Sequence, residues 1–205
     1  MKYDITFGYK KSNLIFDNFH LEFPDDKITV LCGHNGAGKT TLLKILAGIL
    51  PSNINNAEGW FVPLNGGLIR HFSLEEHIKI LGKNTSLLYD EAFEIFSAQS
   101  FSKKRISKLS AGQTIMAALL VAFACNENLL LLDEPYSSLD PTNVENLTKL
   151  LKKRKGTTIL TSHDLFLTSE TSHNIQFLKD GKISWVNGDE NITVDSLREK
   201  YKELA

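Results

Sequence analysis

The sequence is poor in cysteine, and this scarcity excludes several classes of protein. Its 205 residues include two cysteines, Cys32 and Cys125, and both lie inside apolar segments. Such cysteines are typical of small buried side chains in a reduced compartment, so no disulfide framework is expected. The chain has no Cys-x-x-Cys pair and no Cys/His cluster. The sequence therefore predicts no metal cage built from those residues.

Long apolar runs are also missing. The longest strongly apolar stretch, residues 115–125, has eleven residues, whereas a helix needs about 20 to cross a bilayer. Residues 1–4 lack the apolar core of a signal peptide. We therefore expect a cytoplasmic chain without a membrane span of its own.

Neither sign of charge is in excess. Lys and Arg number 23 against 24 Asp and Glu, which gives a net charge of −1. Nucleic-acid-binding proteins usually carry a basic surplus, so no nucleic-acid partner is expected. Apolar residues make up 42% of the chain and charged residues 23%, which is typical of a globular protein. At this length we expect one domain over residues 1–205.

Strand and helix patterns alternate along the chain. Patterns of buried strands occur at 28–32, 129–132 and 157–161, and helical patterns follow the first two at 39–47 and 141–154. This alternation predicts an α/β fold with a largely parallel sheet.

The other segments complete the expected fold. Helical patterns at 73–82 and 87–98 have no strand partner, so we expect them to form a small lobe. The remaining predicted elements are strands at 2–9, 20–23 and 60–62, a loop at 52–67, a buried helix at 110–125, a hairpin of 175–178 with 182–186, and a helix at 194–204.

A glycine-rich segment connects the predicted strand at 28–32 to a helix. It reads Gly33-His34-Asn35-Gly36-Ala37-Gly38-Lys39-Thr40, followed by Thr41, and matches the pattern G-x-x-x-x-G-K-[ST]. Glycines allow backbone N–H groups to point at phosphate oxygens, and the helix N-terminus adds partial positive charge. We expect Lys39 to reach the β- and γ-phosphates and Thr40 to ligate Mg²⁺. This loop alone leaves kinase, GTPase and ATPase open.

Two acidic residues, Asp133 and Glu134, follow the predicted strand at 129–132. Ligands bind at the carboxyl ends of parallel strands, so Asp133 should lie near the glycine-rich loop and hold Mg²⁺. Glu134 is expected to orient or deprotonate an attacking water. A catalytic acid there favours hydrolysis, and no Asn-Lys-x-Asp guanine-reading motif is present, so the pattern disfavours a GTPase.

Three further segments give the chain a family resemblance. Leu109-Ser110-Ala111-Gly112-Gln113 differs by one residue from the Leu-Ser-Gly-Gly-Gln signature of ABC ATPases. Ser138-Leu139-Asp140 resembles their D-loop, and Ser162-His163-Asp164 resembles the segment with their switch histidine. The resemblance runs over about residues 3–185. It implies a P-loop NTPase with a RecA-like, mostly parallel sheet and flanking helices, an antiparallel β subdomain, and a helical subdomain at about 68–125.

The resemblance also implies roles for single residues. Tyr9 resembles the aromatic residue on which adenine stacks, although a strand aromatic packed in the core is the alternative. ABC ATPases dimerise head to tail, so Ser110, Gly112 and Gln113 would contact an ATP bound to the other subunit. Asp140 would link the two sites, and His163 would sense the γ-phosphate and position water with Glu134. The implied ligands are ATP and Mg²⁺.

One position departs from the family pattern. Leu64 stands where a metal-contacting glutamine is usual, and a shift of one residue would present Asn65 instead. The segment at 52–62 is also shorter than usual.

The resemblance implies the ATP-hydrolysing subunit of a membrane ABC transporter, at the inner face of the membrane. Its partners would be a separate transmembrane permease and a second nucleotide-binding subunit, in a homodimer or a heterodimer. The short chain favours export. The alternative is a non-transport ABC ATPase for translation, iron–sulfur assembly or repair.

Overall fold

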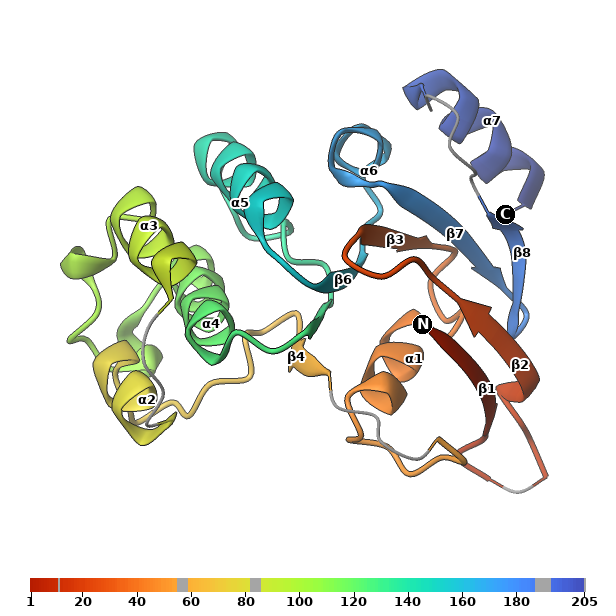
Figure 1. Cartoon of the computed structure of the whole chain (residues 1–205), viewed down its shortest axis with the longest axis horizontal. Coiled ribbons are helices and arrows are strands. Elements are labelled where there is room, and N and C mark those ends of the chain that lie inside the picture. The colour runs from red at the N-terminus through yellow and green to blue at the C-terminus, as the bar shows by residue number, and fades with distance from the viewer. Residues whose placement is uncertain (11, 55–58, 82–85, 187–192, 205) are drawn as a thin grey trace.

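A six-stranded sheet forms the centre of the computed structural model, which describes residues 1–10, 12–54, 59–81, 86–186 and 193–204. The strand order is β4–β5–β6–β3–β7–β8 (Figure 1). Neighbouring strands are parallel except for β8, which pairs antiparallel with β7. The strands are β3 (Ile28–Cys32), β4 (Trp60–Val62), β5 (Leu129–Leu132), β6 (Thr157–Thr161), β7 (Asn174–Lys179) and β8 (Lys182–Val186). The four predicted strands at 28–32, 60–62, 129–132 and 157–161 are confirmed to the residue.

A separate antiparallel pair of strands comes first in the chain. It consists of β1 (Lys2–Phe7) and β2 (Phe16–Glu22). The prediction placed the second strand at 20–23, four residues too late. Asp17 and Asn18 are both exposed, and Asn18 has a φ of +46°. This irregularity interrupts the alternation by which a strand is recognised in a sequence.

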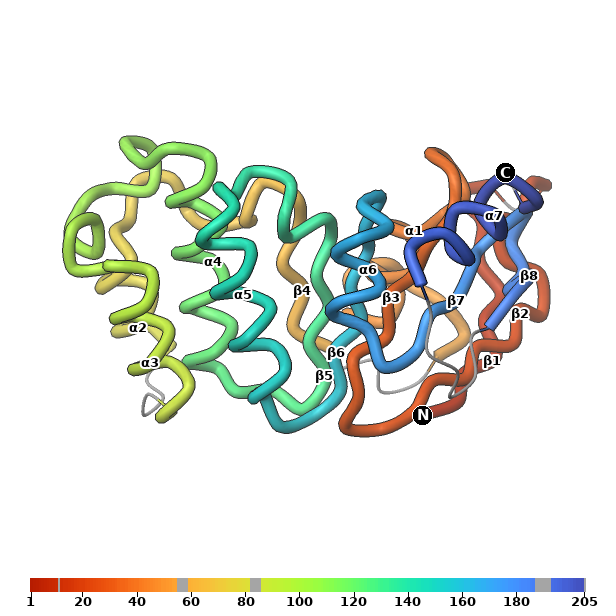
Figure 2. Tube along the Cα trace, turned by 90° about the horizontal axis from the view of Figure 1, so that it is seen from above, coloured from red at the N-terminus to blue at the C-terminus, as the bar shows by residue number. Residues whose placement is uncertain are grey.

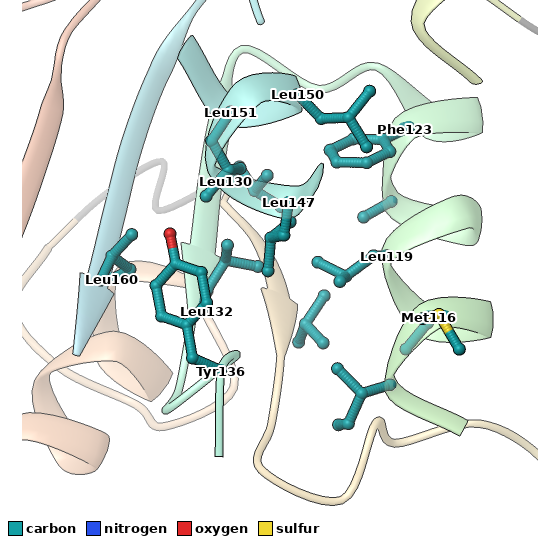
Figure 3. Close-up of a cluster of buried hydrophobic side chains, with 14 of the residues drawn as sticks. Met116, Leu119, Phe123, Leu130, Leu132, Tyr136, Leu147, Leu150, Leu151 and Leu160 are labelled. Carbon is teal, nitrogen blue, oxygen red and sulfur yellow. The ribbon is translucent and has the colours of Figure 1, made fainter. Parts of the chain in front are cut away.

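Alternate residues of the central strands point to opposite faces of the sheet, as the pleat requires. Leu31, Leu129 and Leu131 pack with α1 (Lys39–Leu46) and with the β1–β2 pair. Leu130 and Leu132 face the other side, where Leu147 and Leu150 of α5 (Pro141–Lys153) cover them (Figure 3). Figure 1 shows α1 on one side of the sheet and α5 on the other. Both faces are therefore buried.

Three helices lie at the end of the molecule away from β1 and β2 (Figures 1 and 2). They are α2 (Leu74–Leu81), α3 (Leu87–Ile95) and α4 (Ala111–Cys125), with short 3₁₀ turns at Ala98–Ser100 and Ile106–Lys108. Leu119 and Phe123 of α4 point toward α5 and the sheet (Figure 3), and Met116 belongs to the same core cluster. The helical lobe is thus joined to the sheet through α4. Its boundary at 68–125 stays a prediction.

Two further helices complete the chain. The helix α7 (Val194–Leu204) agrees with the predicted 194–204, whereas α6 (Leu165–Thr171) was not predicted. Residues 55–58 of the predicted loop and residue 82 of a predicted helix lie outside the described residues. Among the helices described, none has the length and apolar character needed to cross a membrane.

Candidate nucleotide site

The glycine-rich loop runs from the end of β3 to the start of α1. Gly33, Gly36 and Gly38 have φ values of +144°, +84° and +101°, which residues other than glycine rarely adopt. A Cβ on Gly33 would also lie 2.4 Å from the carbonyl oxygen of Leu178. The loop needs glycine here for backbone conformation and for close approach to β7. Its strand–loop–helix context is the one that a phosphate-binding loop requires.

The Lys39 side chain is folded into this loop. Its Nζ donates hydrogen bonds to the carbonyl oxygens of Gly33 at 2.7 Å and His34 at 3.1 Å. Burial lowers the pKa of the Lys39 ammonium, and the nearby Glu134 and Asp133 carboxyl groups oppose that shift. The loop therefore holds a cation beside the N-terminus of α1, where an anionic phosphate is favoured.

Thr40 and Asp133 come together at the edge of the sheet where β3 and β5 end. Thr40 Oγ1 donates to Asp133 Oδ2 at 2.8 Å. These oxygens are of the kind that Mg²⁺ prefers, so the pair fits the predicted metal position. Within the described part of the chain, no three His, Cys, Asp or Glu side chains gather as a metal cluster. A metal at this position would therefore complete its shell with phosphate and water oxygens.

Glu134 follows Asp133 in a left-handed backbone conformation, with a φ of +51°. Such strain in a residue other than glycine is concentrated at functional sites. Its Oε1 atom lies 3.0 Å from Nε2 of the exposed His163, yet no hydrogen bond satisfies this buried oxygen among the described residues. Burial raises the pKa of Glu134, while the charges of His163 and Lys39 act in the opposite direction. The site therefore holds a poorly solvated carboxyl group beside an imidazole.

These residues line one cavity of about 440 Å³. Its lining comprises Tyr9, Ile15, Asn35, Gly36, Gly38, Lys39, Thr40, Thr41, Leu64, Asp133, Glu134 and His163. Tyr9 is 64% exposed, so the alternative of a tyrosine packed in the core is wrong. Its hydroxyl lies 3.2 Å from Thr41 Oγ1, and its ring meets Phe7 edge-on at 5.1 Å. This arrangement leaves an aromatic surface available beside the loop.

Leu64, rather than Asn65, lies at this cavity. Val62 is the last residue of β4, and its carbonyl accepts a hydrogen bond from the Asp133 N–H at 3.0 Å. The chain therefore leaves β4 next to the acidic residues. Leu64 also borders a second cavity of about 500 Å³, and Asn65 lines only that second one, together with Thr114 of α4. An aliphatic side chain thus lies at the nucleotide cavity, and its match to the glutamine of the family pattern stays a prediction.

The signature residues lie outside the first cavity. Ser110 caps α4 through a reciprocal pair of hydrogen bonds with Gln113. A Cβ on Gly112 would lie 2.8 Å from the carbonyl oxygen of Ser138, so the signature packs against the D-loop segment. Asp140 caps α5 by accepting from the Asn143 N–H at 3.0 Å. One chain therefore does not bring these residues to its own glycine-rich loop.

Thr161, a residue without a motif signal, connects the two acidic residues. Its hydroxyl donates to Asp133 Oδ1 at 2.9 Å and accepts from the Glu134 N–H at 2.9 Å. Thr161 is the last residue of β6, between β5 and β3 in the sheet. Position at a strand end was the available signal, but it does not reveal which hydroxyl faces a neighbouring strand.

A parallel sheet with Gly33–Thr40 and Asp133 at one edge defines the chain as a P-loop nucleoside triphosphatase. Residues 16–137 match the family model described as ABC transporter. The chain belongs to this family of ATP-binding cassettes, whose members are ATPases, and it is an ATPase of that kind.

Curated relatives cover most of the chain. One is the "Tungstate uptake system ATP-binding protein TupC" of Peptoclostridium acidaminophilum, 31% identical over 85% of this chain and 92% of that protein. Another is the "Probable branched-chain amino acid transport ATP-binding protein LivF" of Archaeoglobus fulgidus, 27% identical over 97% and 94% of the two chains. The ABC ATP-binding subunits of transport systems are thus its relatives.

Solved structures share the fold. A structure titled "Structure of ATP binding subunit of ABC transporter" has a TM-score of 0.80 at 18% identity and covers 99% of this chain and 93% of its own. The cassette MJ0796 bound to ADP and Pi, a dimeric structure, has a TM-score of 0.75 at 21% identity and covers 93% and 99%. The mixed α/β cassette architecture is therefore confirmed.

Proposed function

We propose that this chain powers a membrane transporter by hydrolysing ATP within a head-to-tail dimer of nucleotide-binding subunits. The observation that carries the proposal is the division of the predicted residues between two places. Lys39, Thr40, Asp133, Glu134 and His163 line one cavity, whereas the signature that begins α4 lies outside it. A signature supplied by a second subunit would complete the cavity, and this chain's own signature would serve the other ATP.

In the proposed reaction the loop binds the phosphates through its backbone N–H groups and Lys39. Tyr9 stacks on the adenine ring. Thr40 and Asp133 hold Mg²⁺, which when bound neutralises charge on the phosphate oxygens.

Glu134 and His163 act on the attacking water. The water oxygen bonds to the γ-phosphorus while the bond to the bridging oxygen of ADP breaks, and Glu134 accepts the proton that the water releases. His163 lies at ion-pair distance from Glu134, where it can hold both the carboxylate and the γ-phosphate. Burial raises the pKa of Glu134, which makes it a better proton acceptor than an exposed carboxylate.

The signature would act across the dimer. Ser110 and Gly112 lie at the N-terminus of the fifteen-residue α4, which offers N–H groups and partial positive charge to an anion. Gln113 shapes this end through its bond to Ser110. Asp140, exposed at the start of α5, would link the two sites.

Glu134→Gln tests the proposed dimer. This variant should bind Mg-ATP, hydrolyse it at least about 100-fold more slowly, and accumulate as a dimer in size-exclusion chromatography. The control is Lys39→Ala, which should lose nucleotide binding and stay monomeric. A Glu134→Gln chain that remains monomeric at every concentration with bound Mg-ATP would contradict the head-to-tail arrangement.

In this proposal, ATP binding and hydrolysis drive conformational change in a separate permease at the inner face of the membrane. The support is that relatives include ATP-binding proteins named for tungstate uptake, zinc import and branched-chain amino acid transport. These names favour transport over the non-transport alternative. Export, expected from the short chain, stays a prediction. Co-expression of this chain with its genomic neighbours should yield a complex with a membrane protein, and ATPase activity of that complex should rise when the transported substrate is added. A chain that never copurifies with a membrane protein would count against the pairing.

A further inference from the structure

The carbonyl oxygen of Gly33 lies between two hydrogen-bond donors. Lys39 Nζ donates to it at 2.7 Å, and the hydroxyl of Tyr201 donates to it at 3.2 Å. Tyr201 is 168 residues away in the sequence, in the last helix of the chain. The first residue of the phosphate loop is thus held both by the loop's own lysine and by α7.

Tyr201 is fixed in this position by the packing of α7. Its ring meets Phe177 of β7 edge-on, with the centroids 5.2 Å apart. Leu197, one turn earlier, is buried and 4% exposed. Figures 1 and 2 both show α7 beside β7 and β8. Burial raises the pKa of the Tyr201 hydroxyl, so it remains a donor throughout the neutral range.

The two donors have different tasks when ATP binds. Lys39 must turn its ammonium from Gly33 to the β- and γ-phosphates, which removes its hydrogen bond from the Gly33 carbonyl. Gly33 is buried, and a buried carbonyl without a donor is destabilising. The Tyr201 hydroxyl belongs to α7 and not to the loop, and Tyr201 does not line the nucleotide cavity, so its hydrogen bond to Gly33 does not depend on Lys39.

We propose that Tyr201 is a positioning residue for ATP binding, whose hydroxyl keeps the Gly33 carbonyl hydrogen-bonded after Lys39 turns to the phosphates. The Tyr201 hydroxyl thereby favours release of Lys39 from the loop and preserves the loop's shape in the bound state. This inference rests on ATP binding at the glycine-rich loop, as proposed above, and adds to it a residue from the opposite end of the chain.

Tyr201→Phe tests the proposal because it removes the hydroxyl and keeps the ring against Phe177. The dissociation constant for ATP, measured by titration calorimetry, should rise about 2–10-fold, the worth of one neutral hydrogen bond. The thermal midpoint of the ligand-free variant should change little, because Lys39 still satisfies Gly33 there. In a Lys39→Ala background the same change should lower the midpoint, because Gly33 then loses its last side-chain donor.

Two control variants separate this role from simple packing. Tyr3→Phe removes a hydroxyl whose contact is Met1 Sδ, and it should leave ATP affinity unchanged. Leu197→Ala loosens α7 without removing the Tyr201 hydroxyl, and it should lower the midpoint of the ligand-free chain.

The proposal is overturned if Tyr201→Phe binds ATP as tightly as the wild type. It is also overturned if the ligand-free midpoint of Tyr201→Phe falls as far as that of Leu197→Ala, since the hydroxyl would then be a packing element alone. Failure of the wild-type chain to bind ATP would instead refute the proposed function, and that result is visible before any variant is made.

Discussion

Removing the Thr161 hydroxyl should weaken both the fold and the hydrolysis of ATP. In Thr161→Val the side chain keeps nearly the same volume at a position that is fully buried. The change deletes the donor to Asp133 Oδ1 and the acceptor of the Glu134 N–H, both at 2.9 Å. Glu134 has a left-handed backbone conformation, and the bond from its N–H is one of the contacts that hold it there.

The expected loss of stability follows from these two hydrogen bonds. A hydrogen bond to a carboxyl group that is charged contributes about 1.5–3 kcal/mol, and a buried N–H left without an acceptor costs about 1–3 kcal/mol. Because part of this loss is recovered by the added methyl group, we expect the free energy of unfolding to fall by about 2–5 kcal/mol. Displacement of Glu134 by a fraction of an ångström should lower kcat by about 10–100-fold.

Urea denaturation and steady-state hydrolysis of Mg-ATP measure the two effects. Thr161→Ser keeps the hydroxyl and should retain most of kcat. Thr157→Val is the matched control at the opposite end of β6, because its buried hydroxyl accepts the Asp26 N–H at 3.0 Å. This control should lose stability and keep kcat. A Thr161→Val chain that stays folded with kcat within twofold of the wild type would refute the reasoning.

Gly33→Ala should destabilise the fold by about 3 kcal/mol or more and abolish ATP binding, because its Cβ would lie 2.4 Å from the Leu178 carbonyl oxygen at a φ of +144°. Gly36→Ala is the control: its Cβ meets no atom within 4 Å, so the free energy of unfolding should fall by only about 1–2 kcal/mol. Equal losses for the two variants in urea denaturation would contradict this reasoning. Because burial raises the pKa of Glu134 above its ordinary 4.5, hydrolysis should fall with decreasing pH at a midpoint above that value, where Glu134 takes up a proton. The native state then binds this proton more tightly than the unfolded chain, so stability should fall as pH rises through the raised pKa. Glu134→Gln should remove the contribution of this carboxyl group to the pH dependence of the thermal midpoint. A pH dependence equal to that of the wild type would argue against a raised pKa for Glu134.

The middle strands of the central sheet were predictable because they are short and buried on both faces. The runs at 28–32 and 129–132 have this pattern, and each is followed by a polar motif that marks its end. By contrast, α6 has seven residues and mixed polarity. Its signal is Asp164, which caps it by accepting from the Leu167 N–H, but a single capping residue does not distinguish a short helix from a turn.

The candidate site was predictable where residue type and spacing carry the chemistry. Lys39, Thr40 and Asp133 stand in motifs, and the hydrogen bond between the last two agrees with the expected juxtaposition. Thr161 and Tyr201 have no motif, because their contribution depends on which oxygen a hydroxyl meets across the fold. The uncertainty between Leu64 and Asn65 was likewise a question of which residue the turn after β4 aims at the cavity, and the geometry selects Leu64.

The order of strands in the sheet has a consequence for how this chain folds. The parallel pairing of β3 with β6 joins Ile28 to Thr158, and β5 reaches β3 only through β6. The residues of the nucleotide cavity therefore meet only after contacts form between distant parts of the sequence, which makes folding slow relative to chains with local contacts. Neither half of the sequence contains the site. Gain of ATP binding during refolding should thus report completion of the whole sheet rather than formation of any single motif.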